Sequence, residues 1–309
     1  MKKFILILGV IIILMILTPV GLLYLAPRQA TDLSLYVTRR LAGLERKTLS
    51  LTTGETYVYL EGGRGEPLLL LHGFGANKDN FTLVARHLTP TSHVIIPDHI
   101  GFGESSRPAN ISYAPVAQAE RLHRFVESLG LSRLHIGGSS MGGQIAMTYA
   151  ALYPDQVQSM WLLDPGGVWS APPGELQALL KKGVNPLIAA DTDQFAGIFA
   201  FVMSRPPFIP RPILNVMARE RIENIELEKR IFREIKADNV EGRIAGLKIP
   251  ALIVWGDQDR AISVKTAPVL QRLLPASRVT IMEGIGHLPM VEVPGAAARD
   301  YLAFRSSLS

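Results

Sequence analysis

The chain has 309 residues and is 48% hydrophobic, so it can bury a large core in one domain with an insertion, or in two smaller domains. It has no cysteine, which excludes disulfides, thiolate metal sites and a cysteine nucleophile. The net charge is +5, but no basic stripe is interleaved with aromatic residues, so we expect no nucleic-acid partner.

The N-terminus is an uncharged run of 23 residues, Phe4 to Ala26, preceded by Lys2 and Lys3. As a helix it would be roughly 35 Å long, which exceeds the ~30 Å hydrocarbon core of a bilayer. A cleaved signal peptide would have a shorter apolar core and would end at a small-x-small site, which we do not find here. The sequence therefore predicts an uncleaved transmembrane helix over residues 1–26.

The charges around this run bear on its orientation. Lys2 and Lys3 favour a cytoplasmic N-terminus, which would place the rest of the chain outside the cytoplasmic membrane. Basic residues on the other flank weaken that preference, namely Arg28, Arg39 and Arg40. We expect a single-pass protein with its main domain on the external side.

Residues 27–49 are predicted to form an amphipathic juxtamembrane helix. The apolar residues at helical spacing are Leu33, Tyr36, Val37, Leu41 and Leu44. The helix could pack on its own domain, lie on anionic head groups or pair with a second copy of the chain. The sequence leaves these three alternatives open.

Residues 50–165 are predicted to form the first part of an α/β core. Apolar runs predict strands at 56–60, 68–71, 94–97, 134–136 and 160–163, and helices at 114–129 and 144–152. The strand at 68–71 leads into His72-Gly73-Phe74-Gly75, whose glycines would let the backbone N–H of Phe74 turn into a site. The strand at 94–97 leads into a glycine-rich turn in which we expect Asp98 and Ser105 to form hydrogen bonds.

The stretch Gly138-Ser139-Ser140-Met141-Gly142 fits the G-x-S-x-G pattern, with a strand before it and a helix after it. A serine at such a sharp turn has a strained backbone, and positions 138 and 142 must be nearly free of side chain. The turn would lift the hydroxyl of Ser140 clear of the sheet, and the N-terminus of the helix favours developing negative charge there.

Residues 166–244 differ in character from the core. Prolines cluster at 172–173 and at 206–212, the segment 195–203 is almost wholly apolar, and residues 219–236 are predicted to be one charged helix. This pattern predicts a helical cap or lid inserted between two strands of the sheet. Its apolar face could line an acyl pocket, touch the bilayer or simply pack on the core.

Residues 245–309 are predicted to complete the core, with strands at 251–255 and 278–282 and a final helix after Pro294. Asp259 follows the first of these strands and His287 follows the second. With Ser140 they give the chain order Ser, Asp, His, each at the carboxyl end of a strand. Asp164 and Asp257 remain alternatives for the acid.

The sequence resembles the α/β-hydrolase superfamily from about residue 50 to its end. The motifs that carry the resemblance are H-G-F-G at 72–75, D-H-I-G-F-G-E-S at 98–105, G-S-S-M-G at 138–142, W-G-D-Q-D at 255–259 and G-H-L-P at 286–289. It implies a mostly parallel sheet with helices on both faces. It also implies a catalytic triad of Ser140, His287 and Asp259, with Phe74 and Met141 as oxyanion-hole donors.

The anchor, the core and the apolar cap together resemble membrane-anchored bacterial lipases, phospholipases A and membrane-bound monoacylglycerol lipases. The resemblance implies hydrolysis of glycerolipid acyl esters at the inner membrane of a bacterium, with the catalytic domain on its periplasmic side and a homodimer formed through the anchor and juxtamembrane helix. A carboxylesterase for short soluble esters, a C–C bond hydrolase and a non-catalytic binding protein are the alternatives. No motif implies a metal or an organic cofactor.

Overall fold

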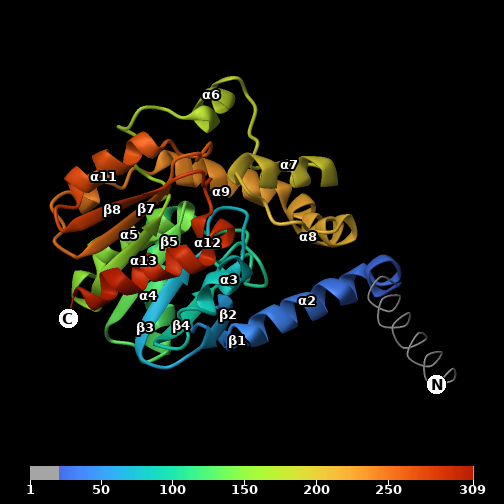
Figure 1. The fold of residues 1–309 in the computed structure, drawn as a ribbon, viewed down its shortest axis with the longest axis horizontal. Helices are drawn as coiled ribbons and strands as arrows, with labels where there is room; N and C mark the ends of the chain where they lie inside the picture. Colours follow the sequence, from blue (N-terminus) through green and yellow to red (C-terminus); the bar gives the residue numbers. More distant parts are fainter. Residues whose placement is uncertain (1–20, 309) are drawn as a thin grey trace, which may run out of the picture.

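The computed structural model of the protein describes residues 21–308, so most of the anchor predicted for residues 1–26 lies outside the described residues. Within residues 21–308, no helix combines the length and the apolar character needed to cross a bilayer. The described chain begins near α2 (Pro27–Leu41), which leads away from the body of the protein toward the N-terminus (Figure 1).

An eight-stranded sheet forms the middle layer, in the order β1-β2-β4-β3-β5-β6-β7-β8. The β1–β2 and β2–β4 pairs are antiparallel and the other pairs are parallel, which confirms the mostly parallel sheet. The strands are β1 (Leu44–Ser50), β2 (Thr56–Gly62), β3 (Glu66–Leu71), β4 (Ser92–Pro97), β5 (Leu134–Ser139), β6 (Val157–Leu163), β7 (Ala251–Gly256) and β8 (Ser277–Met282).

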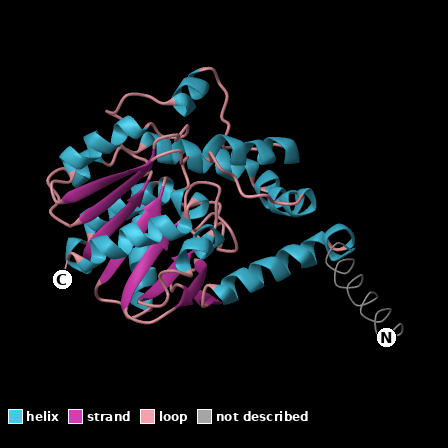
Figure 2. Cartoon of the chain, in the orientation of Figure 1, coloured by secondary structure: helices cyan, strands magenta, loops and turns pink. Residues whose placement is uncertain are grey.

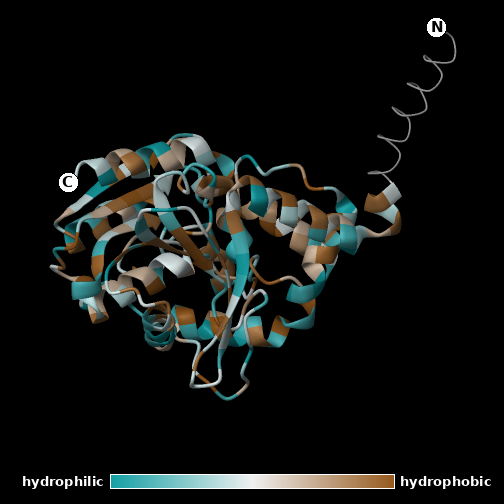
Figure 3. Cartoon of the chain, turned by 90° about the horizontal axis from the view of Figure 1, so that it is seen from below, coloured by the Kyte–Doolittle hydropathy of each residue, from teal (hydrophilic) through white to brown (hydrophobic). Residues whose placement is uncertain are grey.

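Helices cover both faces of this sheet (Figure 2). In β3, Leu69 and Leu71 join one buried cluster, whereas Leu68 and Leu70 join the other. The first cluster includes α4 (Pro115–Ser128), α5 (Met141–Leu152) and α11 (Ala267–Leu273), and the second includes α3 (Thr82–Ala85) and α13 (Pro294–Ser306). Because both faces are covered, the central strands are continuous apolar runs (Figure 3).

The segment between β6 and β7 is helical, with α7 and α8 beside the core (Figure 1). It comprises α6 (Glu175–Lys181), α7 (Thr192–Val202), α8 (Arg211–Glu223), α9 (Ile225–Ala237) and α10 (Glu241–Ile244). The single helix predicted over 219–236 is wrong, since the chain breaks at Asn224 between α8 and α9. The Asn224 side-chain amide donates to the carbonyl oxygen of Glu220 at 2.7 Å and so competes with helical pairing.

The juxtamembrane helix is shorter than the predicted 27–49. It ends at Leu41, and residues Leu44–Ser50 form the edge strand β1 instead. Gly43 has a φ of +69°, the left-handed conformation with which a glycine commonly ends a helix. Leu44, which we expected on the apolar face of the helix, is buried in the core as the first residue of β1.

Helix α2 packs against α8 of the cap, and Arg39 forms a bidentate ion pair with Asp79 at 2.6 Å. The apolar stripe that the sequence predicts on this helix is not covered by the described chain. Leu33 is 52% exposed, Tyr36 60% and Leu41 76%. The helix therefore uses a polar contact to join the core and presents apolar side chains outward.

Candidate active site

Ser140 stands at the turn between β5 and α5. Its φ of +56° and ψ of −118° lie in a region that non-glycine residues rarely adopt, as the motif predicts. A Cβ at Gly142 would lie 2.0 Å from the carbonyl oxygen of Leu71, and one at Gly138 would lie 2.3 Å from the backbone of Gly142. Backbone packing against glycine therefore holds the serine in its strained conformation.

His287 and Asp259 follow β8 and β7, and their side chains meet. His287 Nδ1 lies 2.7 Å from Asp259 Oδ2, and both side chains are buried. The other oxygen, Oδ1, accepts hydrogen bonds from the backbone N–H groups of Ala261 at 2.8 Å and Ile262 at 2.9 Å. A neutral imidazole that donates from Nδ1 keeps Nε2 as an acceptor.

The two alternative acids have other surroundings. Asp257 accepts a hydrogen bond from the backbone N–H of Gly284 at 2.7 Å, which ties one loop to another. Asp164 is buried, and its Oδ1 accepts from the backbone N–H of Gly256 at 2.9 Å. Burial, and then the negative charge of Asp259, raise the pKa of Asp164 well above its usual range. Asp164 therefore favours its neutral form.

Asp164, Asp259 and His287 each bring one polar atom within 4.8 Å of the others. In the part of the chain that the structure describes, this is the group of His, Asp and Glu residues closest to a metal-ligand set. The 2.7 Å contact between His287 and Asp259 is a hydrogen-bond distance, however, and is too short to hold an ion between them. The group is therefore an acid–histidine pair with a neighbouring second acid.

The loop after β3 lies directly against the serine. The backbone N–H of Ala76 donates to the carbonyl oxygen of Gly73 at 3.2 Å, and Gly75 has a φ of +67°, as in a type II turn. A Cβ at Gly73 would lie 3.2 Å from Cβ of Ser140. The residue between the two glycines, Phe74, is thus placed beside the serine.

Met141 is the first residue of α5 and is buried. Its backbone N–H belongs to the first turn of the helix, where no intrahelical acceptor is available. Both predicted oxyanion donors are therefore neighbours of Ser140: Met141 follows it in the chain, and Phe74 lies beside it in space.

His72 supports the Gly73–Ala76 turn. The backbone N–H of His99 donates to His72 Nε2 at 3.0 Å, so His72 Nδ1 carries the proton and donates to the carbonyl oxygen of Gly73 at 2.8 Å. Burial lowers the pKa of His72, which keeps the ring neutral. His72 thus fixes the carbonyl side of the peptide whose N–H belongs to Phe74.

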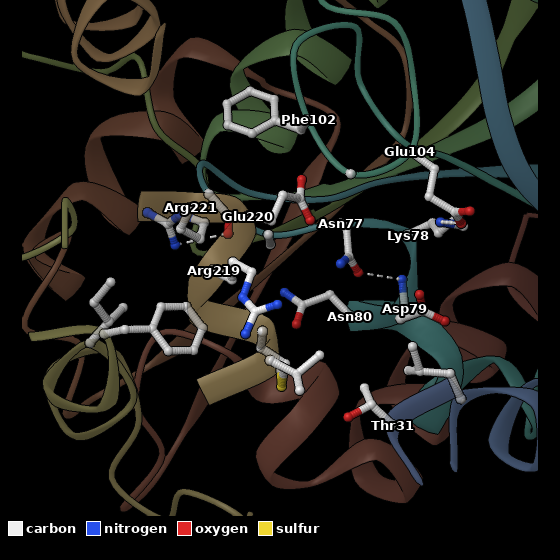
Figure 4. A pocket seen from close by; sticks show the side chains of 18 of the residues that line it. Thr31, Asn77, Lys78, Asp79, Asn80, Phe102, Glu104, Arg219, Glu220 and Arg221 are labelled. Carbon is white, nitrogen blue, oxygen red and sulfur yellow. Dashed lines mark hydrogen bonds and ion pairs between the residues drawn. The ribbon is translucent and has the colours of Figure 1, made fainter. Parts of the chain in front are cut away.

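Ser140 and His287 line one cavity of about 1120 Å³. The cap contributes an apolar wall of Phe195, Ile198, Phe199, Val202 and Met203. Helix α2 also lines the cavity, with Thr31 among its residues there (Figure 4). The cap also contacts His287 directly, because the backbone N–H of His287 donates to the carbonyl oxygen of Val202 at 2.7 Å. The cavity thus extends from Ser140 to the N-terminal helix α2.

Two features of the site are absent from the sequence predictions. Lys78 is buried, and its Nζ lies 2.8 Å from Asp98 and 2.6 Å from Glu104, behind the oxyanion loop. Arg221 of the cap donates to the carbonyl oxygen of Gly75 at 2.9 Å. No motif marks either residue, because their partners are distant in the sequence. Asp98, in contrast, forms the loop hydrogen bonds that we predicted, one of them accepted from the backbone N–H of Lys78.

Known proteins resemble this chain over most of its length. The family described as the alpha/beta hydrolase fold matches residues 66–196. Lipase 1 of Psychrobacter immobilis is 47% identical over 87% of this chain and 87% of its own. Monoacylglycerol lipase abhd6-B of Xenopus laevis is 32% identical over 87% of this chain and 85% of its own.

A crystal structure of a membrane phospholipase A is 38% identical and superimposes with a TM-score of 0.89, over 100% of this chain and 99% of that one. The strained serine, the strand order and these relatives agree with one another. The chain belongs to the α/β-hydrolase family.

Proposed function

We propose that the protein is a membrane-anchored serine hydrolase that cleaves acyl esters of glycerolipids through Ser140, His287 and Asp259. One observation carries the proposal. The strained serine and the buried histidine line a single cavity, which has an apolar wall on cap helix α7 and is also lined by the helix that leads to the predicted anchor. Such a cavity suits an acyl chain that arrives from a membrane.

The chemistry follows from the ionisation of each group. Neutral serine is a weak nucleophile, so Nε2 of His287 takes its proton as the hydroxyl oxygen attacks the ester carbonyl carbon. Asp259 holds the tautomer of His287 and stabilises the imidazolium. The backbone N–H groups of Phe74 and Met141 stabilise the oxyanion. His287 then protonates the leaving alcohol, and water hydrolyses the acyl-enzyme by the same steps.

The chain is a carboxylic ester hydrolase, in keeping with relatives named lipase, monoacylglycerol lipase and phospholipase A. We extend this to a glycerolipid substrate. The apolar cap wall, with Phe195 and Ile198, supports an acyl chain as the group bound there. No cofactor has a role in this scheme.

The membrane location is part of the proposal. It rests on the uncharged run Phe4 to Ala26 and on the outward apolar side chains of α2. Lys2 and Lys3 favour a catalytic domain on the periplasmic side of a bacterial inner membrane. A homodimer through the anchor and α2 would cover the same side chains. Crosslinking in native membranes would test this dimer.

The test is lipid hydrolysis by detergent-solubilised full-length protein, with Ser140→Ala as control. The substrates are p-nitrophenyl esters of graded chain length, then monoacylglycerol, lysophospholipid and diacyl phospholipid. We expect fatty acid release from a glycerolipid and its loss in the variant. Activity confined to short soluble esters, or activity retained by Ser140→Ala, would contradict the proposal.

The choice of acid can be tested separately. Asp259→Asn should lower kcat by about 10⁴-fold, because the amide stabilises the wrong tautomer of His287. Asp164→Asn, which preserves a neutral side chain of the same shape, should lower kcat by less than about tenfold. The reverse order in steady-state kinetics would assign the acid to Asp164.

A further inference from the structure

Arg221, on cap helix α8, lies beside Glu220 at the pocket (Figure 4) and contacts the turn that carries Phe74. Its Nη1 donates to the carbonyl oxygen of Gly75 at 2.9 Å. The guanidinium lies so close to this glycine that a Cβ there would be 2.3 Å from Cζ. It also faces the ring of Phe74, with Cζ 5.8 Å from the ring centroid. One cap side chain thus contacts both central residues of the turn.

The cap holds this guanidinium in a fixed orientation. Glu228 of α9 accepts from Nε of Arg221 and, at 2.9 Å, from Nη2, while the carbonyl oxygen of Leu187 accepts from Nη2 at 2.6 Å. The side chains of Arg221 and Glu228 are only 11% and 5% exposed. A planar fork that is hydrogen-bonded on several sides has little freedom, and the point charge of a lysine cannot reproduce it.

We propose that Arg221 is a positioning residue for the oxyanion hole: it fixes the Gly73–Ala76 turn so that the N–H of Phe74 points at the developing oxyanion. The inference rests on the proposed function, since it needs an oxyanion at Ser140. Gly75 can adopt many backbone conformations, so the turn needs an external contact to hold one of them. A misplacement of about 1 Å in such a site can cost ~10²-fold in rate.

His72 holds the Gly73 carbonyl at the start of the turn, and Arg221 holds the Gly75 carbonyl on the far side of Phe74; the ring contacts of Phe74 do not replace either bond. Its ring packs edge-on against Phe102 and Phe232, with centroids 5.7 Å and 5.3 Å away. Those contacts place the side chain, but they are not directed at the peptide groups of the turn. The bond from Arg221 is directed at a peptide oxygen of the turn, one residue after the proposed donor.

The test compares full-length detergent-solubilised variants on p-nitrophenyl butyrate and on the matching thionoester. The main variant is Arg221→Met with Glu228→Met, because replacing both partners of a buried ion pair by apolar residues leaves no unpaired charge and often preserves folding. Arg221→Lys keeps the positive charge and removes the planar guanidinium, so it tests whether the guanidinium geometry is needed. The matched control is Arg211→Met, which removes an exposed ion pair to Asp193 from the same helix.

For the double variant we expect kcat on the oxygen ester to fall by ~10²-fold, with KM within about threefold. Because sulfur is a weak acceptor, a damaged oxyanion hole loses less on the thionoester. The ratio of kcat on the oxygen ester to kcat on the thionoester should therefore fall by roughly tenfold in the double variant. The ratio for Arg221→Lys should lie between those of wild type and the double variant. Arg211→Met should match wild type in both respects.

An unchanged oxygen-to-sulfur preference in the double variant would overturn the inference, whether or not kcat and the melting temperature fall, because a general packing role predicts that result. Wild-type protein that hydrolyses neither ester, and whose Ser140 is not labelled by a fluorophosphonate, would overturn the proposed function as well. An active, labelled wild type with insensitive variants would overturn the role of Arg221 alone.

Discussion

The two turns beside the reactive serine are stabilised in different ways. The elbow at Gly138–Gly142 is held by close backbone packing against its glycines: a Cβ at Gly138 would lie 2.3 Å from the backbone of Gly142, four residues on. The oxyanion turn at Gly73–Ala76 is held by side chains from elsewhere, including Arg221 of the cap. A turn fixed by local sterics leaves a mark in the sequence, whereas a turn fixed by distant side chains does not.

The largest expected effect comes from adding one methyl group to the elbow. Gly142→Ala would force backbone atoms of β3 and α5 apart, so we expect the free energy of unfolding to fall by about 3 kcal/mol or more, together with activity. Chemical denaturation measures the change. The control is Gly197→Ala in α7, where nothing lies within 4 Å of the new Cβ and stability should rise by ~0.5–1 kcal/mol. Equal effects of the two substitutions would contradict the steric account of the elbow.

The same change in the oxyanion turn should affect activity more than stability. In Gly75→Ala the new Cβ meets the end of the Arg221 side chain rather than backbone, and the positive φ costs about 1–2 kcal/mol. We expect kcat for p-nitrophenyl butyrate to fall at least ~10-fold, because Arg221 must leave the Gly75 carbonyl. If stability fell as far as in Gly142→Ala while kcat stayed unchanged, the contrast between the two turns would not hold.

The smallest expected effect is a pH dependence of folding stability that arises from Glu104, behind the Gly73–Ala76 turn. Burial opposes ionisation of Glu104, but hydrogen bonds from Arg46 and Lys78 outweigh it and lower the pKa of Glu104 from 4.5 to about 2. A depressed carboxyl pKa stabilises the folded state above pH ~4.5, and the contribution disappears as pH falls toward about 2.

Glu104→Gln removes this contribution at every pH. Its melting temperature should therefore lie slightly below that of wild type at pH 7, and the difference should shrink between pH ~4.5 and 2. Thermal unfolding of both proteins across this range measures the change. The side chain is 45% exposed, so the difference is expected to be small. A gap that widened as the pH fell would have the wrong sign for the proposed network.

The predicted parts of the fold are those with local signals. Apolar runs identify the central strands because both faces of the sheet are buried, and the glycine spacing identifies the elbow. The sequence does not predict strand β1, because it is an edge strand with exposed charges, among them Arg46 and Lys47, and because Leu44 continues the helical apolar spacing past Gly43.

The candidate site shows the same division. The strained turn at Ser140 and the contact between His287 and Asp259 could be predicted, because each of these residues follows a strand in a characteristic order. Arg221 and Lys78 could not be predicted, because their contacts depend on partners that only folding brings together. For Arg221 these partners include Gly75 and Glu228. The break at Asn224 between α8 and α9 has no strong sequence signal either.

The central claim is that Ser140 is acylated during turnover. The most direct measurement is acid quenching of the full-length protein during hydrolysis of a long-chain p-nitrophenyl ester, followed by intact-mass and peptide mass spectrometry. The proposed mechanism predicts a mass increase of one acyl chain on the peptide containing Ser140, absent in Ser140→Ala. Continued turnover with no adduct, or an adduct on a different residue, would contradict it.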